Sequence, residues 1–184
     1  MQRIFNQLLH PIVLLILFAL NLYFLMFVMP GAEEKMKFFT GPYTIFDLRT
    51  GYTISDVNTY FEFIGEQGIS TYRSILLWED LFFPLTNGFL YSLAIVYFFK
   101  RSFSNIPQLS LLGIFPFISM IFDYLENFSI VNLIDTYPEI NTTTVVFASS
   151  FTLLKWGFMI LGLLILFTAL LIFLFKKYIF KRIN

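Results

Sequence analysis

The chain has 184 residues, of which 58% are hydrophobic and 21% aromatic, while only 13% are charged. Soluble domains are about half apolar and about a quarter charged, so this composition and a mean hydropathy of +0.76 predict an all-α, polytopic membrane protein. The formal net charge is zero, which gives no reason to expect a nucleic-acid partner. With no cysteine and one histidine, His10, we expect no metal site, no cofactor and no thiol catalysis.

The first apolar run predicts a transmembrane helix over residues 11–29. At roughly 28 Å for about 19 residues, this run spans a bilayer. Pro11 suits the first turn of a helix, and Pro30-Gly31 is a stop signal. Arg3 in front of the run also allows a secretory signal peptide. The run is long and no small-residue cleavage site follows it, so a retained anchor is favoured.

Residues 31–78 form the one long polar segment, which we predict to lie outside the membrane. Its first part, Gly31–Thr50, is rich in Gly, Pro, Thr and charge, and this composition predicts an extended loop.

A short helix is predicted within this segment over Asp56–Ile64. Either Thr53 or Ser55 can cap it, and Gly65 ends it. Its apolar side chains would let the helix lie flat on the membrane or cover the bundle as a lid; they are Tyr60, Phe61 and Ile64.

Three further apolar runs predict transmembrane helices over residues 80–99, 107–128 and 147–175. Pro84 would kink the second predicted span, and Pro116 would bend the third. No internal repeat or second domain is visible. The whole chain therefore reads as a single domain, 1–184, built as a four-transmembrane-helix bundle with a long, partly helical first external loop.

The basic residues set the expected orientation. Arg3, Lys100-Arg101 and four basic residues near the C-terminus fall on one side of the predicted bundle, whereas the loop over residues 128–145 has none. The positive-inside rule then places both termini in the cytoplasm. The abundance of Phe, Ile, Leu, Lys and Asn favours a bacterial source, and hence a bacterial inner membrane.

Polar residues from three predicted spans fall at one depth, in the outer third of the membrane. Asp123, Glu126 and Asn127 are spaced i, i+3 and i+4, so they share one helical face. Asp80 begins the second span, and Lys155 lies near the outer start of the fourth. Because each such group is costly when unpaired in a membrane, we expect them to meet.

Two interpretations of this cluster stay open. In the first, Lys155 pairs with Asp123 or Glu126 and holds the helices together. In the second, the cluster forms a polar pocket roofed by residues 31–78, in which a carboxylate acts as general acid or base and Lys155 or Arg73 orients a ligand. The candidate catalytic residues are Asp123, Glu126 and Lys155. The candidate ligand-binding residues are Tyr72, Arg73, Asp80, Asp123, Glu126, Asn127 and Lys155.

The leading functional hypothesis is a small integral membrane protein that binds a membrane lipid or another hydrophobic small molecule near the outer leaflet. One alternative is an integral-membrane isomerase or hydrolase of a lipid-like substrate that uses the buried carboxylates. Another is an accessory subunit that packs against partner helices, or a homo-oligomer.

A series of short motifs also carries a family resemblance. The chain resembles an uncharacterised family of small bacterial four-helix membrane proteins over about residues 46–156, through Phe46-Asp-Leu-Arg-x-Gly51, Gly65-Glu-x-Gly68, Tyr72-Arg73, Asp80, Pro84, Asp123-x-x-Glu126-Asn127 and Lys155. This resemblance implies that the external segment and the carboxylates of the third helix belong to one unit, and it implies no activity. In size and buried acids the chain is more distantly similar to the emopamil-binding (EXPERA) class, whose carboxylates face a sterol-like ligand.

Overall fold

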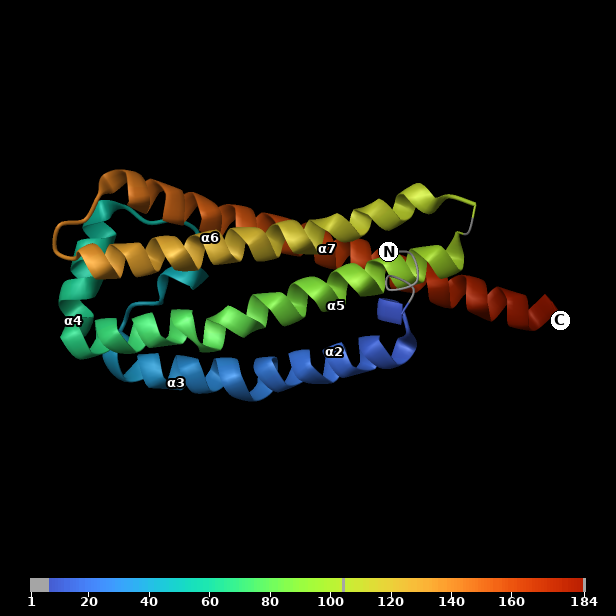
Figure 1. The fold of residues 1–184 in the computed structure, drawn as a ribbon, viewed down its shortest axis with the longest axis horizontal. Coiled ribbons are helices and arrows are strands. Elements are labelled where there is room, and N and C mark those ends of the chain that lie inside the picture. Colours follow the sequence, from blue (N-terminus) through green and yellow to red (C-terminus); the bar gives the residue numbers. More distant parts are fainter. Residues whose placement is uncertain (1–6, 104, 184) are drawn as a thin grey trace.

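The computed structural model describes residues 7–103 and 105–183, with side chains up to Tyr178. Its long helices run side by side along one axis, and α4 (Ile54–Leu77) lies across one end of them (Figure 1). Four helical segments are long and apolar enough to cross a membrane: Pro11–Thr40, Ile54–Ser102, Pro107–Thr136 and Thr142–Tyr178. The protein is therefore an all-α, multi-pass membrane protein, as its composition predicts.

The first segment is longer than the sequence indicates. It consists of α2 (Pro11–Tyr23), a π-helical turn (Phe24–Val28) and α3 (Met29–Thr40). The predicted end at residue 29 and the predicted loop from residue 31 are therefore wrong. Pro30 is the second residue of α3 and follows the π turn, an irregularity of the helix that often accompanies proline.

Packing explains why α3 forms despite its Pro-Gly start. Its buried residues Ala32, Met36 and Thr40 recur every fourth position and make one face, and α3 packs against α4. The helix ends at Gly41, whose φ of 52° favours glycine.

The next helix, α4 (Ile54–Leu77), begins with the expected cap. Thr53 and Asp56 form a capping box, with the Thr53 N–H donating to Asp56 Oδ2 at 2.7 Å. Gly65 interrupts the helix with φ 65° and ψ 179°, so the predicted break is confirmed, although helical turns resume directly after it.

This helix runs across one end of the bundle (Figure 1). Together with residues 41–53 it forms what we name the capped end. Four of its apolar side chains are buried at helical spacing: Val57, Tyr60, Phe61 and Ile64. They pack with Phe46, Tyr52, Ile130 and Leu133 in the larger of the two hydrophobic cores of the described residues. Of the two expected arrangements, the contacts match a lid over the bundle.

The remaining helices are α5 (Glu79–Ser102), α6 (Ile114–Thr136) and α7 (Thr142–Ile183), with a 3-10 segment (Pro107–Gly113) before α6. Pro84 lies inside α5, as predicted. Pro116 instead falls in the first turn of α6, where a helix has no partner for the missing N–H. Pro116 therefore suits the start of α6, in place of the mid-helix bend that we predicted.

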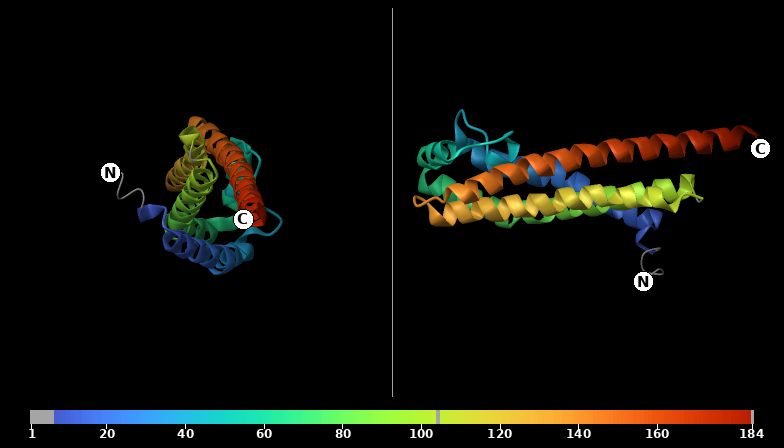
Figure 2. Two further views of the ribbon diagram at one scale, coloured as in Figure 1. Left: turned by 90° about the vertical axis from the view of Figure 1, so that its right-hand side faces the viewer. Right: turned by 90° about the horizontal axis from the view of Figure 1, so that it is seen from above.

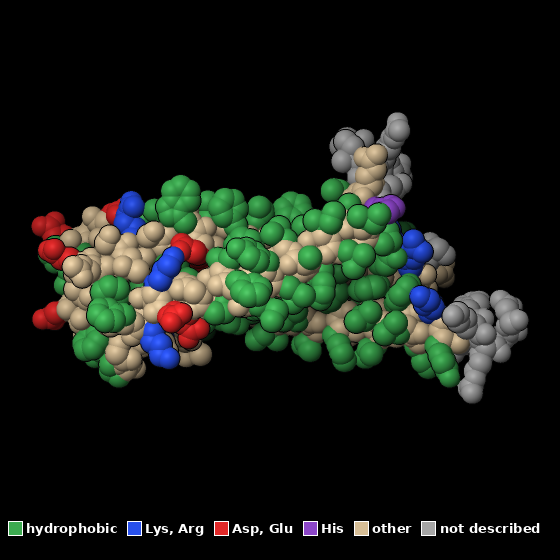
Figure 3. All heavy atoms as spheres, turned by 90° about the horizontal axis from the view of Figure 1, so that it is seen from below, with side chains coloured by type: hydrophobic (Ala, Val, Ile, Leu, Met, Phe, Trp, Pro, Cys, Tyr) green, Lys and Arg blue, Asp and Glu red, His purple; other side chains and the backbone are tan. Residues whose placement is uncertain are grey.

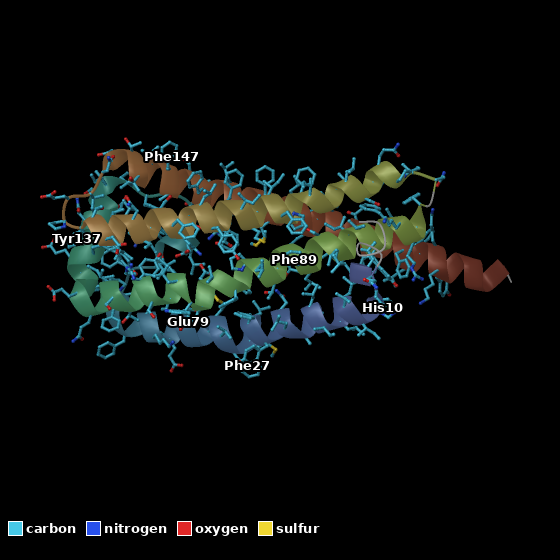
Figure 4. The ribbon with its side chains drawn as sticks, viewed as in Figure 1. His10, Phe27, Glu79, Phe89, Tyr137 and Phe147 are labelled. Atoms are coloured by element: carbon cyan, nitrogen blue, oxygen red, sulfur yellow. The ribbon has the colours of Figure 1, made fainter. Side chains whose placement is uncertain are left out.

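Charged side chains gather toward the two ends of the bundle, and apolar side chains cover the length between them (Figure 3). Phe27 and Leu15 in this region are 66% and 64% exposed. A continuous apolar surface of this kind fits contact with lipid. Tyr137 marks the capped end and His10 lies toward the other (Figure 4).

At the end away from the cap, α7 projects beyond the other helices (Figure 2). This end carries Lys100 and Arg101 in the last turn of α5, and Lys176 and Lys177 on α7. Arg3, used in the orientation argument, lies outside the described residues, as do the side chains of Lys181 and Arg182.

Candidate functional site

Lys155 on α7 lies at the centre of a buried charged cluster. Its Nζ contacts Glu126 Oε2 and lies 3.5 Å from Asp123 Oδ1 and 3.9 Å from Asp47 Oδ1. Lys155 is 7% exposed and Glu126 is fully buried. The pairing of Lys155 with both carboxylates of α6 follows the structural interpretation of the sequence.

Hydrogen bonds fix the carboxyl groups around the lysine. Thr152 Oγ1 donates to Glu126 Oε1 at 2.5 Å, and the Tyr72 hydroxyl donates to Asp47 Oδ2 at 2.6 Å. The indole N–H of Trp156 donates to the backbone carbonyl of Asp47 at 2.9 Å. These bonds tie residues 46–48 and α4 to α7, so the cluster joins the capped end to the transmembrane helices.

Asp80 has different partners. The Asn127 side-chain amide donates to Asp80 Oδ2 at 2.9 Å and to the Asp80 backbone carbonyl at 3.3 Å. Pro84, four residues later, has no N–H for that carbonyl, so Asn127 supplies the donor that α5 lacks. Among the described residues no ion pair joins Asp80 to a basic side chain.

The cluster therefore contains more acids than bases. Asp47, Asp80, Asp123 and Glu126 are four carboxyl groups, and Lys155 is the ammonium group that contacts three of them. Burying charge in excess of its counter-charge is expensive. Within the described part of the chain, no three or more acidic, His or Cys side chains are placed to hold a metal ion.

Two charged residues beside the cluster point elsewhere. Arg73, a predicted ligand-binding residue, pairs with Asp135 at 2.8 Å, and both side chains are more than 40% exposed. The neighbouring Tyr72 side chain faces inward instead, because adjacent residues of a helix point in different directions. Glu79 pairs with Lys35 of α3 at 2.5 Å. The structure thus separates Arg73 from the residues with which we grouped it.

Two members of the cluster were not predicted from the sequence. Asp47 lies in a stretch that we predicted as loop, and Phe46 beside it, which is fully buried, was the available signal. Thr152 precedes Lys155 by three positions, and this spacing placed both on one face of α7.

Tyr52, which we also did not select, is buried against the same cluster. Its backbone N–H donates to Ser149 Oγ at 3.1 Å. Burial raises the pKa of the Tyr52 hydroxyl, and the Glu126 and Asp47 carboxylates raise it further, while Thr152 and Lys155 lower it in part. The phenol therefore stays neutral beside the carboxylates.

A cavity of about 470 Å³ opens beside the cluster, between α3, residues 43–48, the end of α4 and the start of α5. Its walls include Leu25, Met29, Met36, Ile45, Ile75 and Phe83, and Glu33 and Lys37 also line it. Tyr72 belongs both to this wall and to the cluster, since its hydroxyl bonds to Asp47.

A second space, of about 20 Å³, borders Asp123 on the side of α5. Its polar lining consists of Asp123, Ser119, Asn87 and Tyr91. This volume suits a single water molecule. Asn87 also accepts a hydrogen bond from Asn21 of α2, so polar contacts continue from the cluster to the first span.

No protein-family model, curated protein or solved structure matches this chain.

Proposed function

We propose that this protein binds an amphipathic, lipid-like molecule in the cavity between α3 and residues 43–48. The observation that carries this proposal is the cavity itself. Its volume of about 470 Å³ lies within the range of small-molecule sites, roughly 300–1,000 Å³. Its walls are mostly apolar. A hydrocarbon group can therefore move from lipid or water into the cavity without losing hydrogen bonds.

The charges in the cavity wall favour an amphiphile over a pure hydrocarbon. Glu33 and Lys37 lie four residues apart on α3, and both line the cavity. They offer one negative and one positive group to a polar head, while Met29 and Phe83 contact its apolar part. In this proposal Tyr72 closes the inner wall and separates the ligand from Lys155.

The same proposal places the capped end on the outer face of a bacterial inner membrane. The basic residues at the opposite end support this orientation, because Lys100, Arg101, Lys176 and Lys177 belong on the cytoplasmic side under the positive-inside rule. The cavity would then take its ligand from the outer leaflet.

A cavity-filling substitution tests the proposal. Ala32 is 3% exposed and lines the cavity, so Ala32→Leu places a larger apolar side chain in the ligand volume. Ala19→Leu is the matched control, because Ala19 is exposed on α2 and does not line the cavity. The amphiphiles that copurify with each variant are extracted and quantified by mass spectrometry.

We expect the wild type and Ala19→Leu to carry the same amphiphile in similar amounts, and Ala32→Leu to lose it several-fold. Equal amounts in all three proteins would contradict a ligand in this cavity. The melting temperature of each variant shows whether the fold is kept.

The catalytic alternative has less support from the geometry. Lys155 is already occupied by three carboxylates, and the space that borders Asp123 has room for about one water. The large cavity meets the cluster only through Tyr72. A lipid-like substrate bound there would not touch Asp123 or Glu126.

A further inference from the structure

Asp80 and Asn127 form a buried pair in which one hydrogen-bond acceptor has no donor. They are 7% and 4% exposed. Asn127 Nδ2 donates to Asp80 Oδ2 at 2.9 Å, but Asn127 Oδ1 has no donor among the described atoms. An amide oxygen only accepts hydrogen bonds, and so does an ionised carboxylate. If Asp80 were ionised, it would have no hydrogen to offer the neighbouring amide oxygen.

The position of this amide is fixed by the backbone. Because Pro84 leaves the carbonyl of Asp80 without a helical donor, the Asn127 amide is held against Asp80 by a second bond at 3.3 Å. Its Nδ2 is thereby committed to Asp80, and its oxygen stays in the buried interior. The unmet acceptor is a consequence of Pro84 inside α5.

The surrounding charges make an ionised Asp80 still more costly. The groups that act on it are Asp47 before α4, Asp123 of α6 and Lys155 of α7. Lys155 is shared among Asp47, Asp123 and Glu126, which already outnumber it. Tyr124, also on α6, uses its hydroxyl on the carbonyl of Leu81 and does not compensate Asp80.

We propose that Asp80 is a proton-binding site, held as a carboxylic acid in the folded protein and donating its O–H to Asn127 Oδ1. This acid–amide pair satisfies the orphan acceptor and removes one negative charge from the cluster. The unpaired amide oxygen and the excess of carboxyl groups over Lys155 are separate observations, and both favour the acid form. Neither depends on the proposed amphiphile.

Asp80 lies in the second membrane-spanning segment, and Pro84, one turn later, lines the water-sized space that borders Asp123. Buried acids in a membrane protein are the groups that take up and release protons during function.

Infrared spectroscopy of the purified protein tests the proposal, because the C=O stretch of a carboxylic acid is distinct from the bands of a carboxylate. At neutral pH we expect a carboxylic-acid band in the wild type that shifts when aspartate carries a ¹³C carboxyl group and moves slightly in D₂O. We expect Asp80→Asn to remove the band. Asp135→Asn, at an exposed pair with Arg73, should leave it unchanged.

Two results would overturn the proposal. They are the absence of an acid band that the aspartate label shifts at neutral pH, and such a band that survives Asp80→Asn. The label experiment uses the wild-type chain, so the proposal stays testable even if Asp80→Asn fails to fold.

Discussion

A lysine inside a long apolar helix needs a strong reason to stay there. Lys155 is surrounded by Glu126, Asp123 and Asp47, which come from α6 and from the segment before α4. The desolvation of buried ions offsets much of their attraction, so such a cluster contributes little net stability. Removing one member is costly all the same, because its partners stay buried and lose their counter-charge.

Lys155→Met should therefore lower the free energy of unfolding by about 3–5 kcal/mol, the usual cost of breaking a buried pair from one side. Adding Glu126→Gln should recover part of this loss, because the variant then buries one negative charge fewer. Thermal unfolding of the purified variants measures both effects.

Lys35→Met provides the comparison, since the Lys35 side chain is 58% exposed in its pair with Glu79. Loss of that surface pair should cost less than about 1 kcal/mol. Equal losses at Lys35 and Lys155, or a double variant less stable than Lys155→Met, would show that the cluster is not electrostatically coupled.

The helices themselves show where local sequence signals succeed and where packing overrides them. The Thr53 cap and the Gly65 break were predictable because each depends on one or two adjacent residues. Pro30-Gly31 was misread because α3 is held by the burial of Ala32 and Met36 against α4, a contact between distant parts of the chain.

Gly65 should be intolerant of a side chain for backbone reasons alone. With φ 65° and ψ 179°, it adopts a conformation open almost only to glycine, although a Cβ there would meet nothing within 4 Å. Gly65→Ala should lower the free energy of unfolding by about 1–3 kcal/mol.

Gly157→Ala is the matched control, because a Cβ there also meets nothing within 4 Å and the residue lies in regular helix. It should be neutral or stabilising by up to about 1 kcal/mol. Thermal unfolding of both variants gives the comparison. Similar effects at the two positions would mean that the break in α4 does not depend on glycine.

At the scale of the whole molecule, the cluster was only partly predictable. Asp80, Asp123, Glu126, Asn127 and Lys155 could be grouped by depth, because helix spacing and topology fix how far each lies along its span. Asp47 could not, since nothing local says where a segment between two helices will fold back. Arg73 was misplaced because a one-residue difference in position turns a helical side chain by about 100°.

The two ends of the molecule also differ in kind. The capped end contains the larger hydrophobic core, the cavity and the charged cluster, whereas the other end carries Lys100, Arg101, Lys176 and Lys177 around a smaller core. Which end faces the cytoplasm therefore decides from which leaflet the cavity takes a ligand and from which side Asp80 exchanges its proton.

Single introduced cysteines can settle this orientation, since the natural chain contains none. Glu139 and Asn105 are exposed and lie in the turns at the capped and basic ends, respectively. From the positive-inside rule we expect a membrane-impermeant maleimide to label Glu139→Cys in intact cells, and Asn105→Cys only after permeabilisation. If only Asn105→Cys is labelled in intact cells, the topology is the reverse of the expected one and the cavity lies at the inner leaflet. The amphiphile would then have to come from the cytoplasmic side, because the cavity lies at the capped end whichever way the bundle is inserted.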